Sequence, residues 1–188
     1  MQTTNFILSG LGGQGILFMT KMLAQTALRK GINVLGAETH GMAQRGGSVV
    51  SHLKLGDAQS SLVNTGAAHF LLGLEENEAY RNLPFLAHGA KLFANAAPET
   101  FPRPDVTPFL NKMNITYRAV AASQLALDMD VPMASNLALI GFMAAFDDGP
   151  FQAQELRETI QTISPDRFMA ANLKVFEAGV EKGKAIQN

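Results

Sequence analysis

The chain has 188 residues, of which 47% are hydrophobic and 16% are charged, and its formal net charge at pH 7 is −1. This length and composition are typical of one globular domain with a substantial core, and they exclude a disordered chain. The charge gives no basis for electrostatic binding to nucleic acid or to an anionic membrane. We find no apolar stretch long enough to span a bilayer and no signal peptide before the first strand, so we expect a cytoplasmic protein.

The chain contains no cysteine. It therefore cannot form a disulfide, ligate an iron–sulfur cluster through thiolates or use a thiol nucleophile. Its histidines are His40, His52, His69 and His88, and no two of them have the spacing of a zinc-binding helix, so we expect no metal site. Any electron-transfer chemistry would need a redox centre supplied by a cofactor or a partner.

A glycine-rich turn, Gly10 to Gly15, follows the first predicted strand, Thr4 to Ser9. Its sequence contains the pattern G-x-G-x-x-G, and the apolar spacing from Gln14 to Lys30 predicts an amphipathic helix. Such a turn binds a phosphate through its glycines and the helix start, or it only lets strand and helix pack closely; both interpretations stay open. The residues that would form the phosphate site are Gly10, Gly12, Gly13, Gln14 and Gly15.

A second strand is predicted over Asn33 to Ala37, and it completes a βαβ unit. Glu38 follows it, at the spacing at which an acidic residue contacts a ribose hydroxyl in a dinucleotide-binding fold.

The segment from Glu38 to Gly47 has neither helical nor strand periodicity and is rich in glycine and polar residues. It leaves the carboxyl end of a strand, where open α/β sheets bind ligands, and the glycine turn should leave the same edge. We therefore expect the two loops to line one crevice; the alternative is a solvated surface loop. His40 is a candidate proton carrier or a structural hydrogen-bonding residue, and Arg45 a candidate partner for a carboxylate, a phosphate or Glu38.

The middle of the chain predicts further strands over Ser48–Leu55, His69–Leu74, Lys91–Ala94 and Asn114–Val120. Ser60 to Val63 is expected to return as a short hairpin partner, and His52 to lie on the sheet surface rather than to bind a ligand. The acidic run that starts at Glu75 suits the first turn of a helix. The proline-bearing stretch from Pro98 to Pro108 is expected to cross the surface as a connection.

From Pro132 onward the pattern predicts helices only. The segment from Asn136 to Phe146 is apolar nearly all round and should be buried on most sides; because a small domain seldom encloses a helix completely, we expect a partner subunit to cover part of it. The predicted fold is a single α/β domain over 1–188. It consists of a Rossmann-like, mostly parallel sheet flanked by helices over 1–131 and a helical C-terminal part over 132–188.

The Gly-Leu-Gly-Gly-Gln-Gly turn at 10–15 and the run His-Gly-Met-Ala-Gln-Arg-Gly-Gly-Ser-Val at 40–49 resemble the gamma-type catalytic subunits of 2-oxoacid:ferredoxin oxidoreductases. The resemblance covers essentially the whole chain. In the pyruvate and 2-oxoglutarate enzymes the corresponding loop keeps Arg-Gly-Gly but usually differs before it. The residues from His40 to Gln44 therefore favour the indolepyruvate branch, in which this chain corresponds to the small (beta) subunit.

The resemblance implies a two-subunit enzyme whose large (alpha) subunit binds thiamine diphosphate with Mg²⁺ and carries the iron–sulfur clusters. Together the subunits would convert an aryl 2-oxoacid, coenzyme A and oxidised ferredoxin into acyl-coenzyme A, carbon dioxide and reduced ferredoxin. The small subunit would bind no cofactor firmly and would be inactive alone. On this basis Arg45 is a candidate for anion binding and His40 and Gln44 for polar contacts. The glycine turn would face a phosphate-bearing group such as coenzyme A, or a subunit contact.

Two other functions stay open. A self-sufficient dinucleotide-dependent oxidoreductase would bind NAD(P) or a flavin in isolation. A purely structural subunit would stabilise the large one without affecting the activity of each assembled complex.

Overall fold

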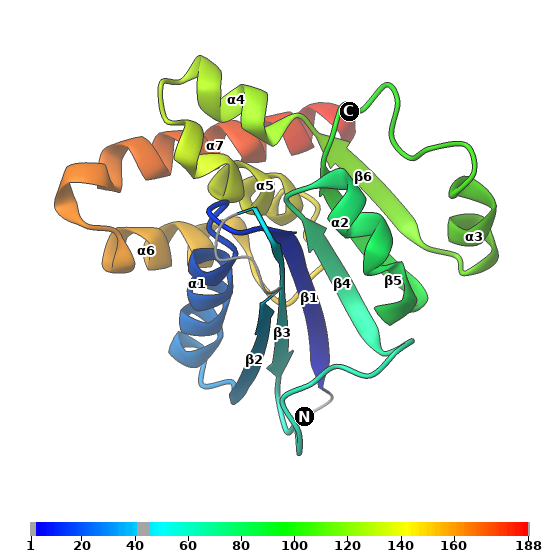
Figure 1. Cartoon of the computed structure of the whole chain (residues 1–188). Coiled ribbons are helices and arrows are strands. Elements are labelled where there is room, and N and C mark those ends of the chain that lie inside the picture. The colour runs from blue at the N-terminus through cyan, green and yellow to red at the C-terminus, as the bar shows by residue number, and fades with distance from the viewer. Residues whose placement is uncertain (1–2, 41–45, 188) are drawn as a thin grey trace.

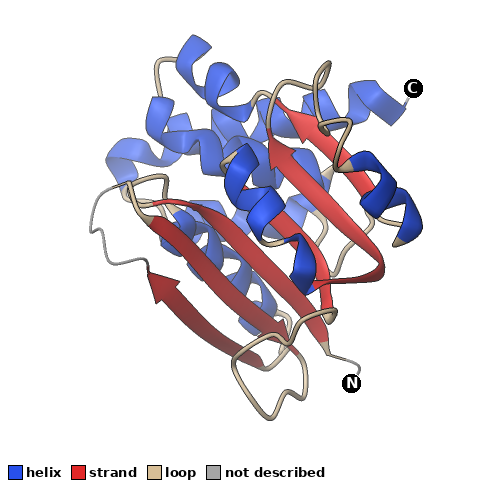
Figure 2. Ribbon diagram, turned by 45° about the vertical axis from the view of Figure 1, so that its right-hand side comes forward, coloured by secondary structure: helices blue, strands red, loops and turns tan. Residues whose placement is uncertain are grey.

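The computed structural model describes residues 3–40 and 46–187, which form a six-stranded sheet with helices on both faces (Figures 1 and 2). The strands are β1 (Thr4–Leu11), β2 (Val34–His40), β3 (Ser48–Leu55), β4 (Ala68–Gly73), β5 (Leu86–Asn95) and β6 (Thr116–Val120). The helices are α1 (Ile16–Arg29), α2 (Glu76–Arg81), α3 (Thr107–Lys112), α4 (Ala122–Asp128), α5 (Ser135–Ala144), α6 (Ala153–Ile163) and α7 (Asp166–Gln187). Short 3-10 helices cover Leu83–Phe85 and Pro132–Ala134. No helix in the described part of the chain has the length and apolarity of a membrane span.

The sheet has the order β2-β3-β1-β4-β5-β6 and confirms the mostly parallel α/β prediction. β1, β4, β5 and β6 pair in parallel, whereas β3 runs antiparallel to both of its neighbours, β1 and β2. The predicted β1–α1–β2 unit therefore has a third strand inserted between its two strands. As a consequence, the carboxyl ends of β1 and β2 and the amino end of β3 all lie at one edge of the sheet.

The predicted hairpin partner at Ser60 to Val63 is wrong, because these residues form a loop without strand pairing. His52 fixes this loop: its Nδ1 accepts a hydrogen bond from the Val63 N–H at 3.2 Å. His52 is also buried, at 5% exposure, rather than on the surface of the sheet as expected. Burial, with a smaller contribution from Lys54, lowers the pKa of His52 and favours the neutral ring that can accept this bond.

Alternate side chains of β1 enter two separate cores. Phe6 and Leu8 pack with apolar residues of α1, α5, α6 and α7, whereas Ile7 packs with α2 and α3 on the opposite face. This period of two is what a strand buried on both faces requires. The central strand that leads into the glycine turn is therefore held on both sides.

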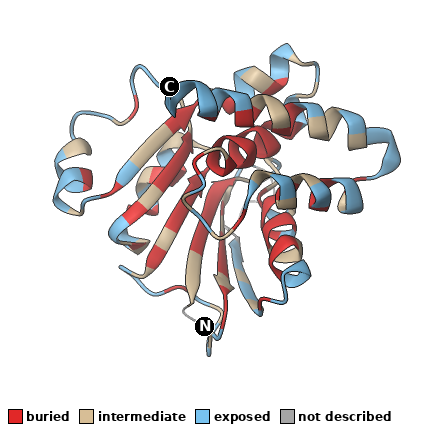
Figure 3. Cartoon of the chain, turned by 180° about the vertical axis from the view of Figure 1, so that it is seen from behind, coloured by how far each residue is buried: buried red, intermediate tan, exposed pale blue. Residues whose placement is uncertain are grey.

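α5 is buried along its whole length by the chain itself, as its red colour in Figure 3 shows. α7 crosses it at glycines: a Cβ added at Gly141 would collide with the carbonyl oxygen of Phe176, and one at Gly179 with that of Ala138. The prediction that α5 is largely buried is confirmed. The chain alone buries this helix, because α7 packs closely against it, so the burial of α5 does not require the partner subunit that the sequence led us to expect.

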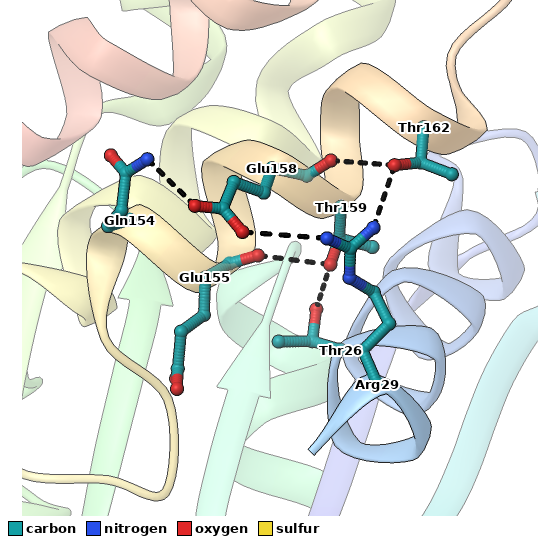
Figure 4. A network of polar contacts seen from close by, with 7 residues as sticks. All are labelled: Thr26, Arg29, Gln154, Glu155, Glu158, Thr159 and Thr162. Carbon is teal, nitrogen blue, oxygen red and sulfur yellow. Dashed lines mark hydrogen bonds and ion pairs between the residues drawn. The ribbon is translucent and has the colours of Figure 1, made fainter.

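α6 holds the far end of α1 through a network of polar contacts (Figure 4). The buried hydroxyl groups of Thr26 and Thr159 lie 2.9 Å apart, and the Arg29 guanidinium donates to the Thr162 hydroxyl at 2.8 Å. The same arginine reaches a carboxylate oxygen of Glu158 at 3.4 Å. α1 begins at the glycine turn, and this network holds its other end. The network therefore helps to fix the orientation of the helix, and with it the position of the helix start beside the turn.

Candidate functional site

As predicted, the glycine turn lies beside the residues at which the β2–β3 connection joins its two strands. Leu11, the last residue of β1, pairs with Ser48, the first residue of β3, and the Gly12 N–H donates to the carbonyl of Gly47 at 2.9 Å. On the other side of the connection, His40 ends β2 opposite Val49. The two loops therefore leave the same edge of the sheet, and they are in contact where they join their strands.

Of the three predicted catalytic residues, Gln44 and Arg45 lie outside the described residues. His40 is placed only as the final residue of β2. The chemical roles of all three therefore remain predictions.

The glycines of the turn serve different purposes. A Cβ at Gly10 would lie 2.7 Å from Oε1 of Gln14 and 2.9 Å from Cδ1 of Ile16, so Gly10 allows close packing. Gly13 has φ +101°, and a Cβ there would meet no atom of the described residues within 4 Å. Gly15, with φ 82°, precedes the first residue of α1. The packing interpretation thus fits Gly10, whereas Gly13 is the position at which the backbone is open to a ligand.

The backbone N–H groups of the turn also fall into two groups, those that donate a hydrogen bond within the described chain and those that do not. Gly12 donates to Gly47, and the Gln14 N–H donates to the carbonyl of Leu11 at 3.1 Å. The Gln14 side chain closes the turn, since its Oε1 accepts the Leu11 N–H at 2.7 Å. The N–H groups of Gly13 and Gly15 have no hydrogen-bond partner among the described residues. Two amides are therefore left to meet an acceptor beside the start of α1.

Asn136 supports the turn from α5, a role that the sequence analysis missed. Its amide Nδ2 donates to the Gly15 carbonyl at 3.2 Å, and its Oδ1 accepts the Leu137 N–H at 2.8 Å. The side chain is buried, at 4% exposure. A polar residue at the head of an apolar helix is the one sequence signal that could have pointed to it.

Glu78 supports the other loop from α2 and was also missed. Its carboxylate is 2% exposed, and it accepts hydrogen bonds at 2.6 Å from the Ser48 hydroxyl and at 2.6 Å from the Arg81 guanidinium. Since Ser48 is the first residue of β3 and pairs with Leu11, Glu78 helps to fix the start of β3 beside the end of β1. A buried carboxylate is tolerated here because both of its oxygens are paired.

A polar hollow of about 390 Å³ lies on the α2 side of the turn and is lined by Leu11, Glu75, Asn77, Glu78, Tyr80, Arg81 and Arg103. Its arginines are already engaged, Arg81 with Glu78 and Arg103 with Asn77 at 2.6 Å. Burial raises the pKa of Tyr80 to about 12, so its phenol stays protonated and donates to Glu76 at 2.8 Å. The hollow is therefore polar but has little surplus positive charge.

An apolar groove of about 440 Å³ lies on the other side of the turn. Its walls are Gly15, Phe18, Asp130, Val131, Pro132, Met133, Ala134, Asn136, Leu137, Phe168 and Asn172. The glycine turn thus separates a polar hollow from an apolar groove.

The sheet register keeps Glu38 away from the turn. Glu38 pairs with Ser51, which pairs with Leu8, so the insertion of β3 places Glu38 two strands from β1, about 10 Å across the sheet. It also lies level with the middle of β1 rather than with its carboxyl end. This arrangement does not place Glu38 where the dinucleotide-binding prediction requires it. Among the described residues, no group of three or more His, Asp or Glu side chains could hold a metal ion.

Comparisons with known proteins agree along nearly the whole chain. A family model described as pyruvate ferredoxin/flavodoxin oxidoreductase matches residues 5–182. Indolepyruvate oxidoreductase subunit IorB of Archaeoglobus fulgidus is 32% identical, with 93% of this chain and 92% of the relative covered. The same subunit of Pyrococcus horikoshii is 31% identical, with 100% of both chains covered. The crystal structure of the gamma subunit of a keto/oxoacid ferredoxin oxidoreductase from Geobacter sulfurreducens shares the fold, with a TM-score of 0.74, 21% identity and coverage of 97% of this chain and 99% of that one.

Proposed function

The chain belongs to the pyruvate ferredoxin/flavodoxin oxidoreductase family, and we propose that it is the small subunit of a 2-oxoacid:ferredoxin oxidoreductase that acts on indolepyruvate or another aryl pyruvate. The observation that carries the proposal is the end-to-end match to subunits named for indolepyruvate oxidoreductases. The run of residues at 40–49, which favours the same branch, adds to it.

In the proposed reaction, the 2-oxoacid loses carbon dioxide, its acyl group passes to the thiol of coenzyme A, and the two electrons released pass to ferredoxin. The large subunit would hold thiamine diphosphate, Mg²⁺ and the iron–sulfur clusters; thiamine diphosphate supplies the carbanion stabilisation that decarboxylation needs. The small subunit has no cysteine with which to ligate a cluster. It would be inactive alone, in the cytoplasm, and would contribute one wall of the active site.

The glycine turn and the β2–β3 connection would form that wall. The N–H groups of Gly13 and Gly15, which have no acceptor in the part of the chain that the structure describes, would meet an anionic oxygen, from a coenzyme A phosphate or the 2-oxoacid carboxylate. Arg45 would bind the same class of anion through its guanidinium fork, and His40 and Gln44 would make polar contacts in the cleft. These groups would also exclude water from the reacting acyl group. Glu78 and Asn136 would hold the two loops in position.

One observation favours the purely structural alternative. Gly10, Gln14 and Asn136 all have packing or hydrogen-bonding partners within the chain that account for them without a ligand. The self-sufficient dinucleotide alternative has no such support, because Glu38 lies two strands away from β1.

Co-expression with the candidate large subunit tests the proposal. We expect the two chains to purify together and to form acyl-coenzyme A from indolepyruvate and coenzyme A. The variant Arg45→Ala should raise the Michaelis constant for coenzyme A or the 2-oxoacid, and Arg45→Lys should restore part of the loss. Unchanged Michaelis constants and turnover in Arg45→Ala would remove the anion-binding role. Saturable binding of NAD(P) or flavin by the isolated chain would instead support the dinucleotide alternative.

A further inference from the structure

We propose that the apolar groove beside Gly15 is the docking site for an apolar segment of the large subunit. This inference rests on the proposed function, because it requires that such a partner exists. It adds the surface through which the partner binds.

The groove exposes large apolar side chains to water. Met133 is 74% exposed and Phe168 is 47% exposed, and the two come from different segments, the 3-10 helix before α5 and the start of α7. Phe18, in the first turn of α1, lines the same groove. Contiguous exposed apolar side chains of this size typically mark an interaction site.

The chemistry of the walls fits an apolar protein segment. Asp130 is the one charged residue among the described residues that line the groove. The amide groups are already used, since Asn136 is bonded to Gly15 and Leu137 and the Asn172 Nδ2 donates to the Ser164 hydroxyl at 3.0 Å. Depletion of charge with enrichment of Phe and Met is typical of the centre of a protein interface. The occupant therefore presents apolar side chains, with a basic residue favoured opposite Asp130.

The groove is too open to serve as a small-molecule site. A ligand pocket encloses about 70–90% of its ligand. The side chain of Met133, at 74% exposure, faces water rather than an enclosed space. A protein segment supplies the missing wall itself, so it matches this shape where a small apolar molecule does not.

Continuity with the glycine turn identifies the large subunit rather than a second copy as the occupant. Gly15 belongs to both the turn and the groove, and Asn136 lines the groove while it bonds to Gly15. A large subunit that faces the turn, as the proposed function requires, lies directly beside the groove. A second copy seated there would crowd the same turn and compete with the large subunit for it.

The groove is also preformed. α5, which carries Asn136 and Leu137, is locked to α7 by the contacts at Gly141 and Gly179. Rigid walls reduce the ordering cost of association.

The first test measures the affinity of the full-length chain for the large subunit. Met133→Glu and Phe168→Glu should each weaken binding by about 10-fold or more, because they place a charge at the centre of an apolar contact. Leu28→Glu is the matched control: Leu28 is 52% exposed but lies at the other end of α1, about 20 Å from Gly15 along the helix axis. It should leave the affinity within about 2-fold. Unchanged melting temperatures show that the variants are folded.

The second test uses the absence of cysteine. Met133→Cys gives the chain a single thiol, which can carry a photoreactive benzophenone maleimide before the large subunit is added. We expect cross-links from position 133 to the large subunit and none from a Leu28→Cys control. Cross-links to a second copy of this chain, or groove variants that assemble with wild-type affinity, would overturn the docking site while leaving an active wild-type complex. A wild-type chain that binds no large subunit would instead overturn the proposed function.

Discussion

Replacing Glu78 by alanine removes the contact that anchors the first residue of β3 to α2. The charge-assisted bond to the Ser48 hydroxyl, at 2.6 Å, contributes about 1.5–3 kcal/mol to stability. The bond to Arg81 adds less, roughly 0–1 kcal/mol, because the Arg81 side chain is 69% exposed. We therefore expect Glu78→Ala to lower the free energy of unfolding by about 1.5–4 kcal/mol, which corresponds to a fall in melting temperature of roughly 3–16 °C for a chain of this size.

A double-mutant cycle with Ser48→Ala assigns this loss to the hydrogen bond. Once Glu78 has been removed, Ser48→Ala should cost almost nothing, which gives a coupling energy of about 1.5–3 kcal/mol by urea unfolding. Glu75→Ala is the control: this neighbouring carboxylate makes no ion pair or side-chain hydrogen bond with any described residue, and its loss should cost under about 0.5 kcal/mol. Strictly additive effects of the Glu78 and Ser48 variants would refute the reasoning.

Three further variants or conditions test other parts of the structure. Gly179→Ala should lower the free energy of unfolding by at least about 3 kcal/mol, because its Cβ collides with the carbonyl of Ala138. Denaturant unfolding measures this loss. A loss under about 1 kcal/mol would contradict the close crossing of α5 and α7. Gly13→Ala should lower the free energy of unfolding by only about 1–2 kcal/mol, through backbone strain at φ +101°, but it should reduce coenzyme A-dependent turnover. If each assembled complex of this variant kept full turnover, the result would favour the structural alternative. Burial lowers the folded-state pKa of both His52 and His69 below the ordinary value of 6.5. Their contribution to stability is therefore present above about pH 6.5 and is lost as the pH falls, so the urea midpoint should drop between pH 7.5 and 5.5, and should drop less in His52→Gln. A midpoint that does not change with pH would exclude this linkage.

Local patterns predicted most of the elements because most strands and helices are specified by their own apolar spacing. They missed α3, which begins at Thr107 inside the stretch expected to be a surface connection. They did not predict the position of β3. The strand spacing of Ser48 to Leu55 shows that it is a strand but not which strands it joins. The short connection from β2 does carry that information, since a connection of this length favours an antiparallel neighbour over a parallel crossover. The inserted β3 is also what separates Glu38 from the glycine turn.

The supports of the site could not be predicted because their partners are remote in the sequence. Asn136 reaches Gly15 across 121 positions, and Glu78 reaches Ser48 across 30. The glycines of α7 escaped notice for a similar reason: the apolar stripe of this helix is visible in the sequence, but the need for a missing Cβ at Gly179 depends on how closely α5 approaches. The juxtaposition of the two loops, by contrast, followed from the rule that ligand-binding loops gather at the carboxyl edge of the sheet.

The most direct test of the central claim is the rate of indolepyruvate- and coenzyme A-dependent ferredoxin reduction by the purified large subunit, with and without this chain. We expect no reduction by either chain alone, and a rate that rises to saturation as this chain is added. A large subunit that runs at its full rate by itself would contradict the account. It would leave this chain a structural or regulatory role and remove the catalytic roles proposed for the glycine turn and for His40, Gln44 and Arg45.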